Sequence, residues 1–328
     1  MGSAGVAVAQ EVKLRFHHFS SPHGWDGKVM VGKVVDLIEQ GSKGRIDVTV
    51  FPGMQLGGKP SALVDQVTDG VVDLVYTLPG YTAGRFPVLA GLELPFLGAA
   101  GAAVTTRLAW DYYDAYAKVD FKGFRPVAIT MTDTGLLHTT KKKVAKIEDL
   151  RGLKIRVASR YIGITVKELG GVPVQMPLPA VYEALARGQV QGMMIPWMIM
   201  KPFKLHDVTS HHLEIPAYHS TLLQLIGEKS YQKLPADLRA VIDRVSTRET
   251  SDWIAVRQDR QGQISREYGV KKGAEIGRLS KEALDRWIAR ATASHEVWIK
   301  EMDKRGYKGA EMLAFLKKTA KKYQAEAK

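Results

Sequence analysis

The most regular pattern of apolar and polar positions lies over residues 147–160. Apolar residues at positions 153, 155 and 157 alternate with basic residues at 154 and 156, and this period of two predicts a strand. Ser159 is a favourable N-cap for a helix over residues 160–169, and the Gly-Gly pair that follows would end it. The end of a strand therefore meets the start of a helix, with Arg156 on the face opposite the apolar set.

Strand and helix patterns also alternate through the N-terminal part of the chain. Short apolar runs bounded by turn residues predict strands over residues 12–16, 46–51 and 71–77. Helical spacing predicts one helix from about Trp25 to Gln40 and a shorter one that ends at Gly70. This β-α-β-α-β order predicts a parallel sheet covered by helices. A further helix over residues 97–118 carries aromatic residues at a spacing typical of a core.

A second series of alternating elements follows residue 131. It comprises predicted strands over residues 136–139, 153–157, 172–176 and 190–195 and predicted helices over residues 160–169 and 179–187. We expect these to form a second parallel sheet. Apolar runs over residues 124–131 and 215–226 predict two crossings between the sheets, and two crossings would make a hinge. Helices are predicted from Pro235 to about Tyr268, over 280–304 and over 308–326.

These elements predict an α/β protein of two lobes, each a sheet flanked by helices, with long C-terminal helices. We expect lobe I to comprise residues 11–127 and 218–257, and lobe II to comprise residues 128–217 and 258–328. Residues 1–9 end in small apolar residues that are similar to the end of a secretion signal, and they predict a signal-peptide remnant or residues added for expression.

Composition narrows the class of protein. The 328 residues are 45% hydrophobic, which suits two globular domains, and no apolar run reaches the eighteen residues or so of a membrane span. The absence of cysteine excludes disulfides, cysteine catalysis and thiolate metal sites. The net charge of +13 lies largely in residues 141–143 and the C-terminal segment, without interleaved aromatic residues. It predicts a solvated face or the steering of an anionic ligand, and no nucleic-acid binding.

Two arginines mark the predicted strand-helix junction. In α/β sheets such junctions bind ligands, and the free N–H groups of a helix start favour anions. Because guanidinium groups grip carboxylates in a bidentate manner, Arg156 and Arg160 are candidates for binding an acidic small molecule. The alternative for each is a structural salt bridge or a solvent-exposed side chain.

Motifs for catalysis and cofactor binding are missing from the sequence. There is no nucleophile elbow, no Walker A loop and no dinucleotide fingerprint, and the two histidine groups near His17 and His211 lack metal-ligand spacing. We therefore predict no catalytic residue, no cofactor and no metal. Tyr81 and Trp197 each follow a predicted strand where a ligand could lie, although Trp197 could equally pack inside the hinge.

Five segments together resemble one protein family. They are VFPGMQLGG, DGVVDLV, GRFP with ELPFL, IEDLRGLKIRV, and ALARGQVQGMMIPW followed by KPFKLHDV. Their order and spacing are similar to those of the extracytoplasmic solute-binding proteins of TRAP transporters, from about Val12 to the C-terminal helices. The resemblance implies a two-lobed periplasmic binding protein fold that closes on an organic acid and delivers it to membrane subunits for sodium-driven import.

The resemblance also implies roles for particular residues. The ligand-gripping arginine of the family falls on Arg156, in LKIRV. Many members place an asparagine on the ligand where this chain has Ile195, so that polar contact does not carry over and sialic-acid-type ligands are disfavoured. The combined motifs resemble a branch associated with aromatic or bulky apolar acids, including 2-oxo and 2-hydroxy acids.

We therefore expect a periplasmic, non-enzymatic protein that binds a monocarboxylate with an acid clamp and an apolar wall. The predicted ligand-binding residues are Arg156, Arg160, Trp197, Tyr81, Trp25, His138, Met176 and Met193. His138 would hydrogen-bond the carboxylate or a neighbouring oxygen, and its alternative is a structural role. Two rival hypotheses are a lyase or hydrolase in a two-lobed cleft and a sensor that presents its ligand to a signalling partner.

Overall fold

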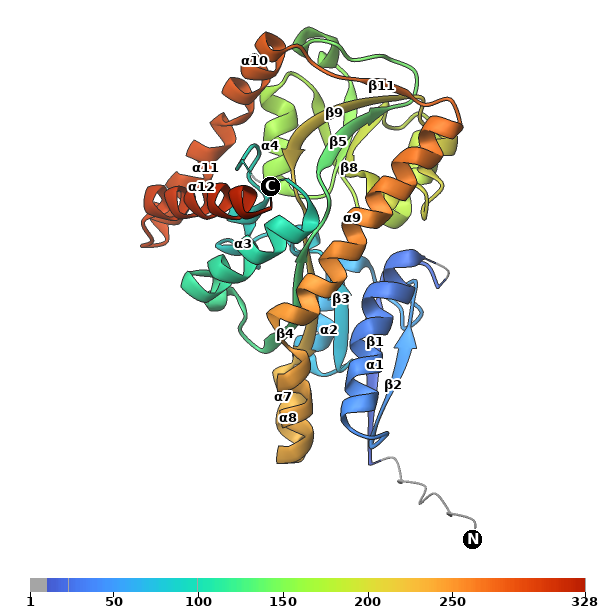
Figure 1. The fold of residues 1–328 in the computed structure, drawn as a ribbon, viewed down its shortest axis with the longest axis vertical. Coiled ribbons are helices and arrows are strands. Elements are labelled where there is room, and N and C mark those ends of the chain that lie inside the picture. The colour runs from blue at the N-terminus through green and yellow to red at the C-terminus, as the bar shows by residue number, and fades with distance from the viewer. Residues whose placement is uncertain (1–10, 23, 99, 328) are drawn as a thin grey trace. The chain divides into compact units, whose positions relative to one another are not determined.

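The computed structural model describes residues 11–22, 24–98 and 100–327. The predicted signal-peptide remnant, residues 1–9, lies outside the described residues. The chain forms two compact units: unit 1 comprises Met1–Thr77, Phe121–Ala128 and Leu223–Thr250, and unit 2 comprises Leu78–Asp120, Ile129–Leu222 and Ser251–Lys328. Each contains strands and helices (Figure 1), so the predicted α/β class is confirmed.

The sheet of unit 1 has the strand order β2-β1-β3-β10-β4. Its strands are β1 (Val12–His18), β2 (Ile46–Phe51), β3 (Leu74–Thr77), β4 (Phe124–Met131) and β10 (Thr221–Gly227). Its helices are a π-helix (Asp26–Val31), α1 (Gly32–Gly41), a 3-10 turn (Pro60–Ala62), α2 (Leu63–Asp69), α7 (Glu228–Lys233) and α8 (Ala236–Val245). Strand β1 is parallel to β2 and β3, as predicted.

The described sheet of unit 2 has the order β11-β9-β5-β8-β6-β7. Its strands are β5 (Gly135–Thr139), β6 (Lys154–Val157), β7 (Val172–Gln175), β8 (Gly192–Pro196), β9 (His211–Tyr218) and β11 (Glu275–Gly277). Its α-helices are α3 (Ala102–Ala115), α4 (Arg160–Glu168), α5 (Val181–Ala186), α6 (Trp197–Met200), α9 (Arg248–Lys271, which starts in unit 1), α10 (Lys281–Ala291), α11 (Ala293–Lys304) and α12 (Gly309–Glu326). Short 3-10 turns lie at Pro79–Tyr81, Leu89–Glu93, Ala117–Asp120, Ile147–Leu150, Leu178–Ala180 and Leu205–Asp207.

Strand direction corrects the prediction of two parallel sheets. In unit 2, β6 is parallel to β7 and β8, but β5 runs antiparallel to both β8 and β9. In unit 1, β10 runs antiparallel to β3. The sheets are therefore mixed. Only strands joined through a crossover helix must run parallel, and neither β5 nor β10 is reached through one.

Other corrections concern interruptions that apolar periodicity does not reveal. The predicted run over 215–226 is two strands, β9 and β10, separated at His219 and Ser220. The predicted helix from Pro235 to Tyr268 is two helices, α8 and α9, and the predicted helix over 280–304 is divided at Thr292 into α10 and α11. Strand β11 is absent from the predicted elements because three residues are too short to show a period.

Helix α3 starts later than predicted, at Ala102 rather than Leu97. The preceding Gly101 has a positive φ of 84°, a backbone conformation that does not occur within a right-handed α-helix. Asp259 on α9 accepts the N–H groups of Ala102 and Ala103 at 2.6 and 3.0 Å, and so satisfies the free donors at the start of α3. A side chain distant in sequence therefore fixes this helix boundary.

The two faces of the unit 2 sheet differ in character. One face packs Leu137, Ile155 and Met194 against Ile162 of α4 and Trp287 of α10, all of them buried. Side chains alternate along a strand, so Arg156, between Ile155 and Val157, points to the opposite face. The pattern of residues 153–157 predicted this orientation.

The predicted lobe boundaries and the compact units differ at one segment. Residues 78–120, predicted as part of lobe I, pack into unit 2. The other boundaries of the compact units, after residues 128, 222 and 250, lie close to the predicted lobe boundaries. The lobe ranges themselves stay a prediction.

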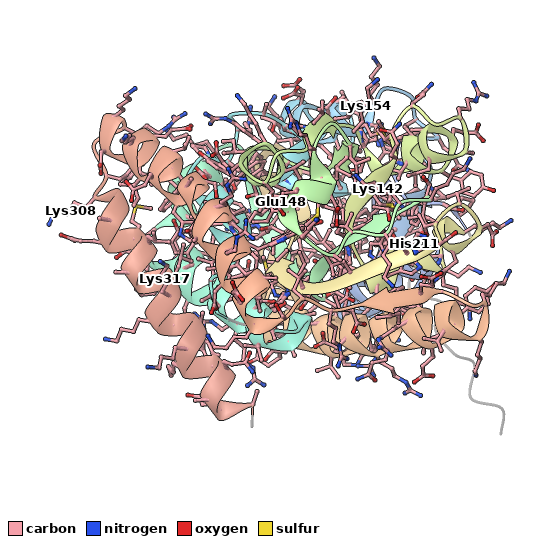
Figure 2. All side chains as sticks on the ribbon, turned by 90° about the horizontal axis from the view of Figure 1, so that it is seen from above. Lys142, Glu148, Lys154, His211, Lys308 and Lys317 are labelled. Carbon is pink, nitrogen blue, oxygen red and sulfur yellow. The ribbon has the colours of Figure 1, made fainter. Side chains whose placement is uncertain are left out.

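Exposed cations account for much of the charge on unit 2. Figure 2 labels Lys142, Lys154, Lys308 and Lys317, all of which are exposed. Several of the basic side chains are paired with acids, as Lys308 is with Glu311 at 2.9 Å. The positive charge therefore belongs to a solvated surface.

Candidate functional site

One row of paired residues crosses four strands of the unit 2 sheet. Arg156 on β6 is paired with Met193 on β8, and Met193 is paired with His138 on β5. His138 is in turn paired with His212 on β9. Paired residues on neighbouring strands project to the same face. The fold thus brings three of the predicted site residues side by side, on the face opposite the core.

Arg156 is a buried cation, with only 2% of its surface exposed. Its Nε donates to the carbonyl oxygen of Met176, just beyond β7, at 3.0 Å. No carboxylate among the described residues forms an ion pair with it. An uncompensated buried charge is costly, by several kcal/mol even after the protein relaxes. This guanidinium is therefore placed to receive an anion.

Tyr218 lies within electrostatic range of both Arg156 and Glu93. Burial raises the pKa of the Tyr218 phenol, while the charge of Arg156 opposes that rise. Glu93 is fully buried and its Oε1 accepts the N–H of Thr221 at 3.0 Å. Burial raises the pKa of the Glu93 carboxyl. Burial therefore disfavours a negative charge on Glu93, and no ion pair joins it to Arg156 among the described residues.

His138 has both ring nitrogens engaged. Its Nε2 lies 3.1 Å from the carbonyl oxygen of Ile195, and a carbonyl only accepts, so Nε2 carries the proton. Its Nδ1 then accepts from Nδ1–H of His212, at 2.6 Å. Burial and the neighbouring His212 hold the pKa of His138 well below its ordinary value. A hydrogen bond from His138 to a carboxylate, as predicted, would require one of these two bonds to break.

Trp197 packs within a cluster of histidines. Its ring centroid lies 4.9 Å from those of His138 and His212, and it stacks on His206 at 5.8 Å with an interplanar angle of 20°. Only 5% of Trp197 is exposed. It also borders a cavity of about 580 Å³ in unit 2, which Asp133 and Leu136 line as well. Imidazoles already occupy much of its surface, so stacking on a ligand stays a prediction.

Tyr81 and Met176 are linked to the site by hydrogen bonds that involve backbone groups. The Tyr81 hydroxyl accepts the N–H of Leu178 at 3.0 Å, and Gln175 donates to the carbonyl oxygen of Gly80 at the same distance. The loop after β3 is thereby tied to the segment after β7, whose Met176 carbonyl holds Arg156. Gly80 also permits a close approach to the segment after β6, because a Cβ there would lie 2.6 Å from that of Ser159.

Ser159 and Arg160 form the predicted junction between β6 and α4. Ser159 has the extended backbone of an N-cap, but its side chain makes no capping hydrogen bond. The predicted N-cap position is therefore confirmed, without a capping bond from the hydroxyl. The backbone N–H of Gly163 instead bonds the Ser159 carbonyl at 3.0 Å.

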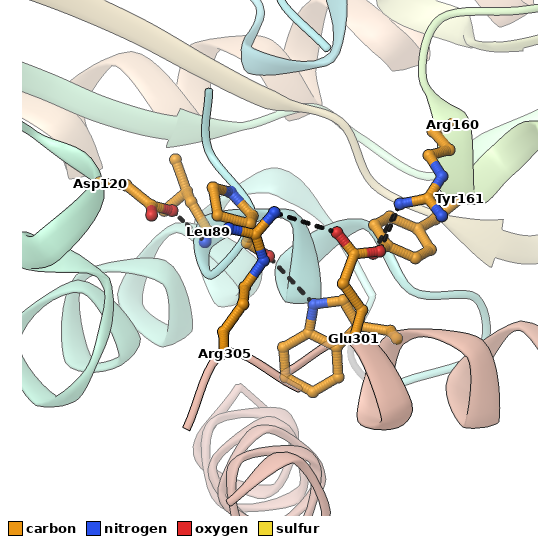
Figure 3. Close-up of polar contacts among 8 residues, drawn as sticks. Leu89, Asp120, Arg160, Tyr161, Glu301 and Arg305 are labelled. Atoms are coloured by element: carbon orange, nitrogen blue, oxygen red, sulfur yellow. Dashed lines mark hydrogen bonds and ion pairs between the residues drawn. The ribbon is translucent and has the colours of Figure 1, made fainter. Parts of the chain in front are cut away.

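Arg160 is held by Glu301 on α11. Its Nη1 donates to Glu301 Oε2, and the Tyr161 hydroxyl donates to the same oxygen at 2.9 Å (Figure 3). Partial burial would raise the pKa of Glu301, but the bonds from Arg160 and Tyr161 hold it below the ordinary value. Unlike Arg156, Arg160 has a carboxylate partner. In this structure Arg160 therefore forms a structural ion pair, which was the alternative to ligand binding that the sequence left open.

A small cavity of about 60 Å³ lies at this junction. Ser159, Arg160 and Gln175 line one part of it together with Glu93, and the remaining wall includes Phe86. Its walls belong to unit 2, so the predicted Trp25, which lies half-buried in unit 1 beside the π-helix, is not part of it.

Two residues of this region escaped sequence reasoning. Glu93 lies in the ELPFL segment, and its acidic side chain before an apolar run was a usable signal. Glu301 lies in a helix with many charged residues, and nothing local distinguishes it from Glu296. Within the described ranges, no group of three histidine or acidic side chains is arranged to hold a metal ion.

The comparisons with known proteins agree with this architecture. The model of the bacterial extracellular solute-binding protein family 7, DctP, matches residues 18–302. The chain belongs to this family of extracytoplasmic solute-binding proteins. The described part of the chain contains no helix long and apolar enough to cross a membrane.

Two solved structures are similar over nearly the whole chain. One is a marine metagenome TRAP solute-binding protein, from an unidentified microbe, that is specific for aromatic acid ligands and was solved with metahydroxyphenylacetate. It has a TM-score of 0.91 and 36% identity, covering 95% of this chain and 99% of that one. The other, from Rhodoferax ferrireducens, was solved with copurified benzoate and has a TM-score of 0.92 and 34% identity over 96% and 99% of the two chains. The two-lobed TRAP binding-protein fold is thereby confirmed.

Curated relatives are more distant. An uncharacterised protein of Sinorhizobium fredii is 26% identical over 80% of this chain, and the sialic acid-binding periplasmic protein SiaP of Vibrio cholerae is 25% identical over 64%. The matches span 46% and 66% of those proteins. The chain thus covers less than two thirds of either relative, so their activities and partners bear on it only as proposals.

Proposed function

We propose that the protein is the substrate-binding subunit of a TRAP-type transporter and captures an aromatic or bulky apolar monocarboxylate, possible forms of which include 2-oxo and 2-hydroxy acids. Arg156 grips the carboxylate through its terminal nitrogens. The observation that carries the proposal is the burial of Arg156 without a carboxylate partner among the described residues. A bound carboxylate would replace the lost hydration and supply charged hydrogen bonds, each worth roughly 1.5–3 kcal/mol.

The remainder of the ligand is proposed to be apolar because of what surrounds Arg156. Met193 lies beside it on β8, and Ile195 projects to the same face two residues further along. Neither side chain offers a hydrogen bond to a sugar hydroxyl. The two similar structures solved with aromatic acids support the same class of ligand. Met176, Tyr81, His138, Trp197 and Trp25 remain proposed neighbours of the ligand, and Arg160 a proposed second contact.

Family membership supports the remaining parts of the proposal. The protein would act outside the cytoplasm, in the periplasm, and would hand its ligand to TRAP membrane subunits without changing it chemically. The members and neighbours in these comparisons are solute-binding proteins. The predicted lobe I and lobe II would close on the ligand through the predicted hinge.

Calorimetric titration tests the proposal. We expect benzoate or 3-hydroxybenzoate to bind with micromolar affinity, equivalent to about 8 kcal/mol. Benzamide has the same ring without the charge and should bind at least about a hundredfold more weakly. Glucuronate keeps the carboxylate but replaces the apolar part with hydroxyls, and should also bind weakly. Equal affinity for benzoate and benzamide would contradict the clamp, and a preference for glucuronate would contradict the apolar wall.

A further inference from the structure

The junction between β6 and α4 carries two arginines with different partners. Arg156 lies in the strand and forms no ion pair with the described residues, whereas Arg160 begins α4 and is bonded to Glu301. Arg156 is held at the end of β7 by the Met176 carbonyl, and Arg160 lines a cavity together with Gln175, the last residue of β7. Arg156 and Arg160 are thus four residues apart in sequence. Of the two, only Arg160 has its positive charge compensated by a carboxylate of the described residues.

Glu301 is well placed to keep Arg160 compensated. Its Oε2 accepts from Arg160 and Tyr161, and Arg305 approaches its Oε1 at 3.5 Å from the following turn of the chain (Figure 3). The Glu301 side chain is 22% exposed, compared with 55% for Arg160. The carboxylate is thus the more firmly positioned member of the pair, and the arginine is the member that solvent reaches.

Arg160 also lines the 60 Å³ cavity at the junction. Its lining also includes Phe86 and Leu89, which are apolar and buried. A guanidinium without a partner beside these walls would attract a second carboxylate, because arginine forms bidentate charged hydrogen bonds to carboxylates. Pairing with Glu301 removes that attraction.

We propose that Glu301 is a specificity-determining residue, which restricts the ligand to one carboxylate by occupying Arg160. The inference rests on the proposed capture of a monocarboxylate by Arg156. Two unpaired guanidinium groups at this junction would suit a dicarboxylate, and one unpaired group suits a monocarboxylate. A residue on α11, far from the junction in sequence, thereby sets the charge of the ligand.

The test compares benzoate with its 1,3- and 1,4-dicarboxylate analogues by calorimetry, in the wild-type protein and in Glu301→Gln. Glutamine retains an acceptor for Tyr161 but removes the negative charge. We expect the affinity for at least one dicarboxylate to rise about tenfold or more in the variant. The affinity for benzoate should change by less than about threefold, because a net charge at a distance is screened by salt.

Two further variants separate specificity from general effects. Glu296→Gln removes one charge from an exposed position on the same helix and should leave the ratio of the two affinities unchanged. Glu301→Gln combined with Arg160→Gln should lose the gain for dicarboxylates, since the released arginine is then missing. Thermal unfolding of each variant checks that the fold persists.

The outcomes distinguish the inference from the proposed function. If benzoate binds the wild type but Glu301→Gln leaves the ratio for both dicarboxylates unchanged, the role of Glu301 is wrong and the proposed function stands. The role is also wrong if the gain survives removal of Arg160. If benzoate fails to bind the wild type, the proposed function itself fails.

Discussion

Arg156 Nε donates to the carbonyl oxygen of Met176 at 3.0 Å. This bond uses one of the five N–H donors of the guanidinium and fixes its orientation against the end of β7. Among the described residues, the other donors have no carboxylate to bind. A ligand therefore meets a cation whose side-chain freedom is already lost, which lowers the entropic cost of binding.

Replacing Arg156 should separate binding from folding. Arg156→Ala removes the clamp, and we expect the affinity for benzoate to fall by at least about a hundredfold in calorimetry, the loss of two charged hydrogen bonds. Arg156→Lys keeps the charge without the fork and should lose about tenfold or more. Thermal stability should fall little, because the substitution to alanine also removes an uncompensated buried charge.

Arg151→Ala is the matched control for these variants, since Arg151 is exposed in the turn just before β6. Its affinity for benzoate should equal that of the wild type. Retention of full affinity by Arg156→Ala would remove the clamp from the proposed function.

Ile195 offers a test of the apolar end of the ligand. It is 2% exposed, and the family resemblance in the sequence implies an asparagine at this position in many members. We expect Ile195→Asn to weaken benzoate binding about tenfold and to reduce the free energy of unfolding by roughly 1–3 kcal/mol, the cost of burying an amide without partners. Ile195→Val, which keeps the apolar character, should change the affinity less than about threefold. Calorimetry with urea unfolding measures both effects; a tighter benzoate complex in the asparagine variant would contradict the proposal.

The fluorescence of Trp197 should report ligand binding. Its ring contacts His138, which lies two strands from Arg156 in the same row. We expect benzoate to change the tryptophan emission of the wild type and the change to be lost in Trp197→Phe. Trp253→Phe, on α9, should retain it. An unaltered response in Trp197→Phe would mean that another tryptophan senses the ligand.

Acid should destabilise the protein through the buried histidines. Burial, then His206 and His211, lowers the pKa of His212 to about 4, while Glu214 partly opposes this. The unfolded chain takes up a proton near pH 6.5 and the folded chain resists it, so stability present above pH 6.5 is lost as the pH falls toward 4. For His212 alone the loss between pH 8 and pH 5 is roughly 2 kcal/mol.

Urea unfolding at pH 8 and pH 5 measures this effect. His212→Gln can still donate to His138 but cannot be protonated, so its stability should depend less on pH by about that amount. His211→Gln is the control: it removes only one of the smaller causes of the His212 shift and should retain most of the wild-type dependence. If His212→Gln keeps the full dependence, the acid sensitivity arises from other groups, such as His18, whose pKa burial also lowers to about 4.

Sequence periodicity predicted the elements around Arg156 well because they obey local rules. The alternation over residues 153–157 and the glycine pair after α4 each act within a few residues, and both gave correct elements. Strand direction did not follow from the same reasoning. The antiparallel placement of β5 depends on which strands it meets in the sheet, and no residue within β5 encodes that choice.

The site was predictable where a residue's role depends on its own strand. Arg156 and Met193 fall on one face because of their positions in β6 and β8. Arg160 was harder, since its state depends on Glu301, 141 residues away. His138 likewise is defined by its bonds to Ile195 and His212, which only the folded sheet brings together.

The residues paired from Arg156 to His212 lie at regular intervals across the unit 2 sheet. Neighbouring strands are about 4.8 Å apart, so Met193 stands about 5 Å from the level of Arg156 and His138 about 10 Å from it. A ligand anchored at Arg156 and extended along this row would present successive atoms to successive strands. Substitutions at positions 193 and 138 should then alter the acceptance of short and long side groups independently, which offers a route to redesigning the protein as a sensor that reports how long an acid is.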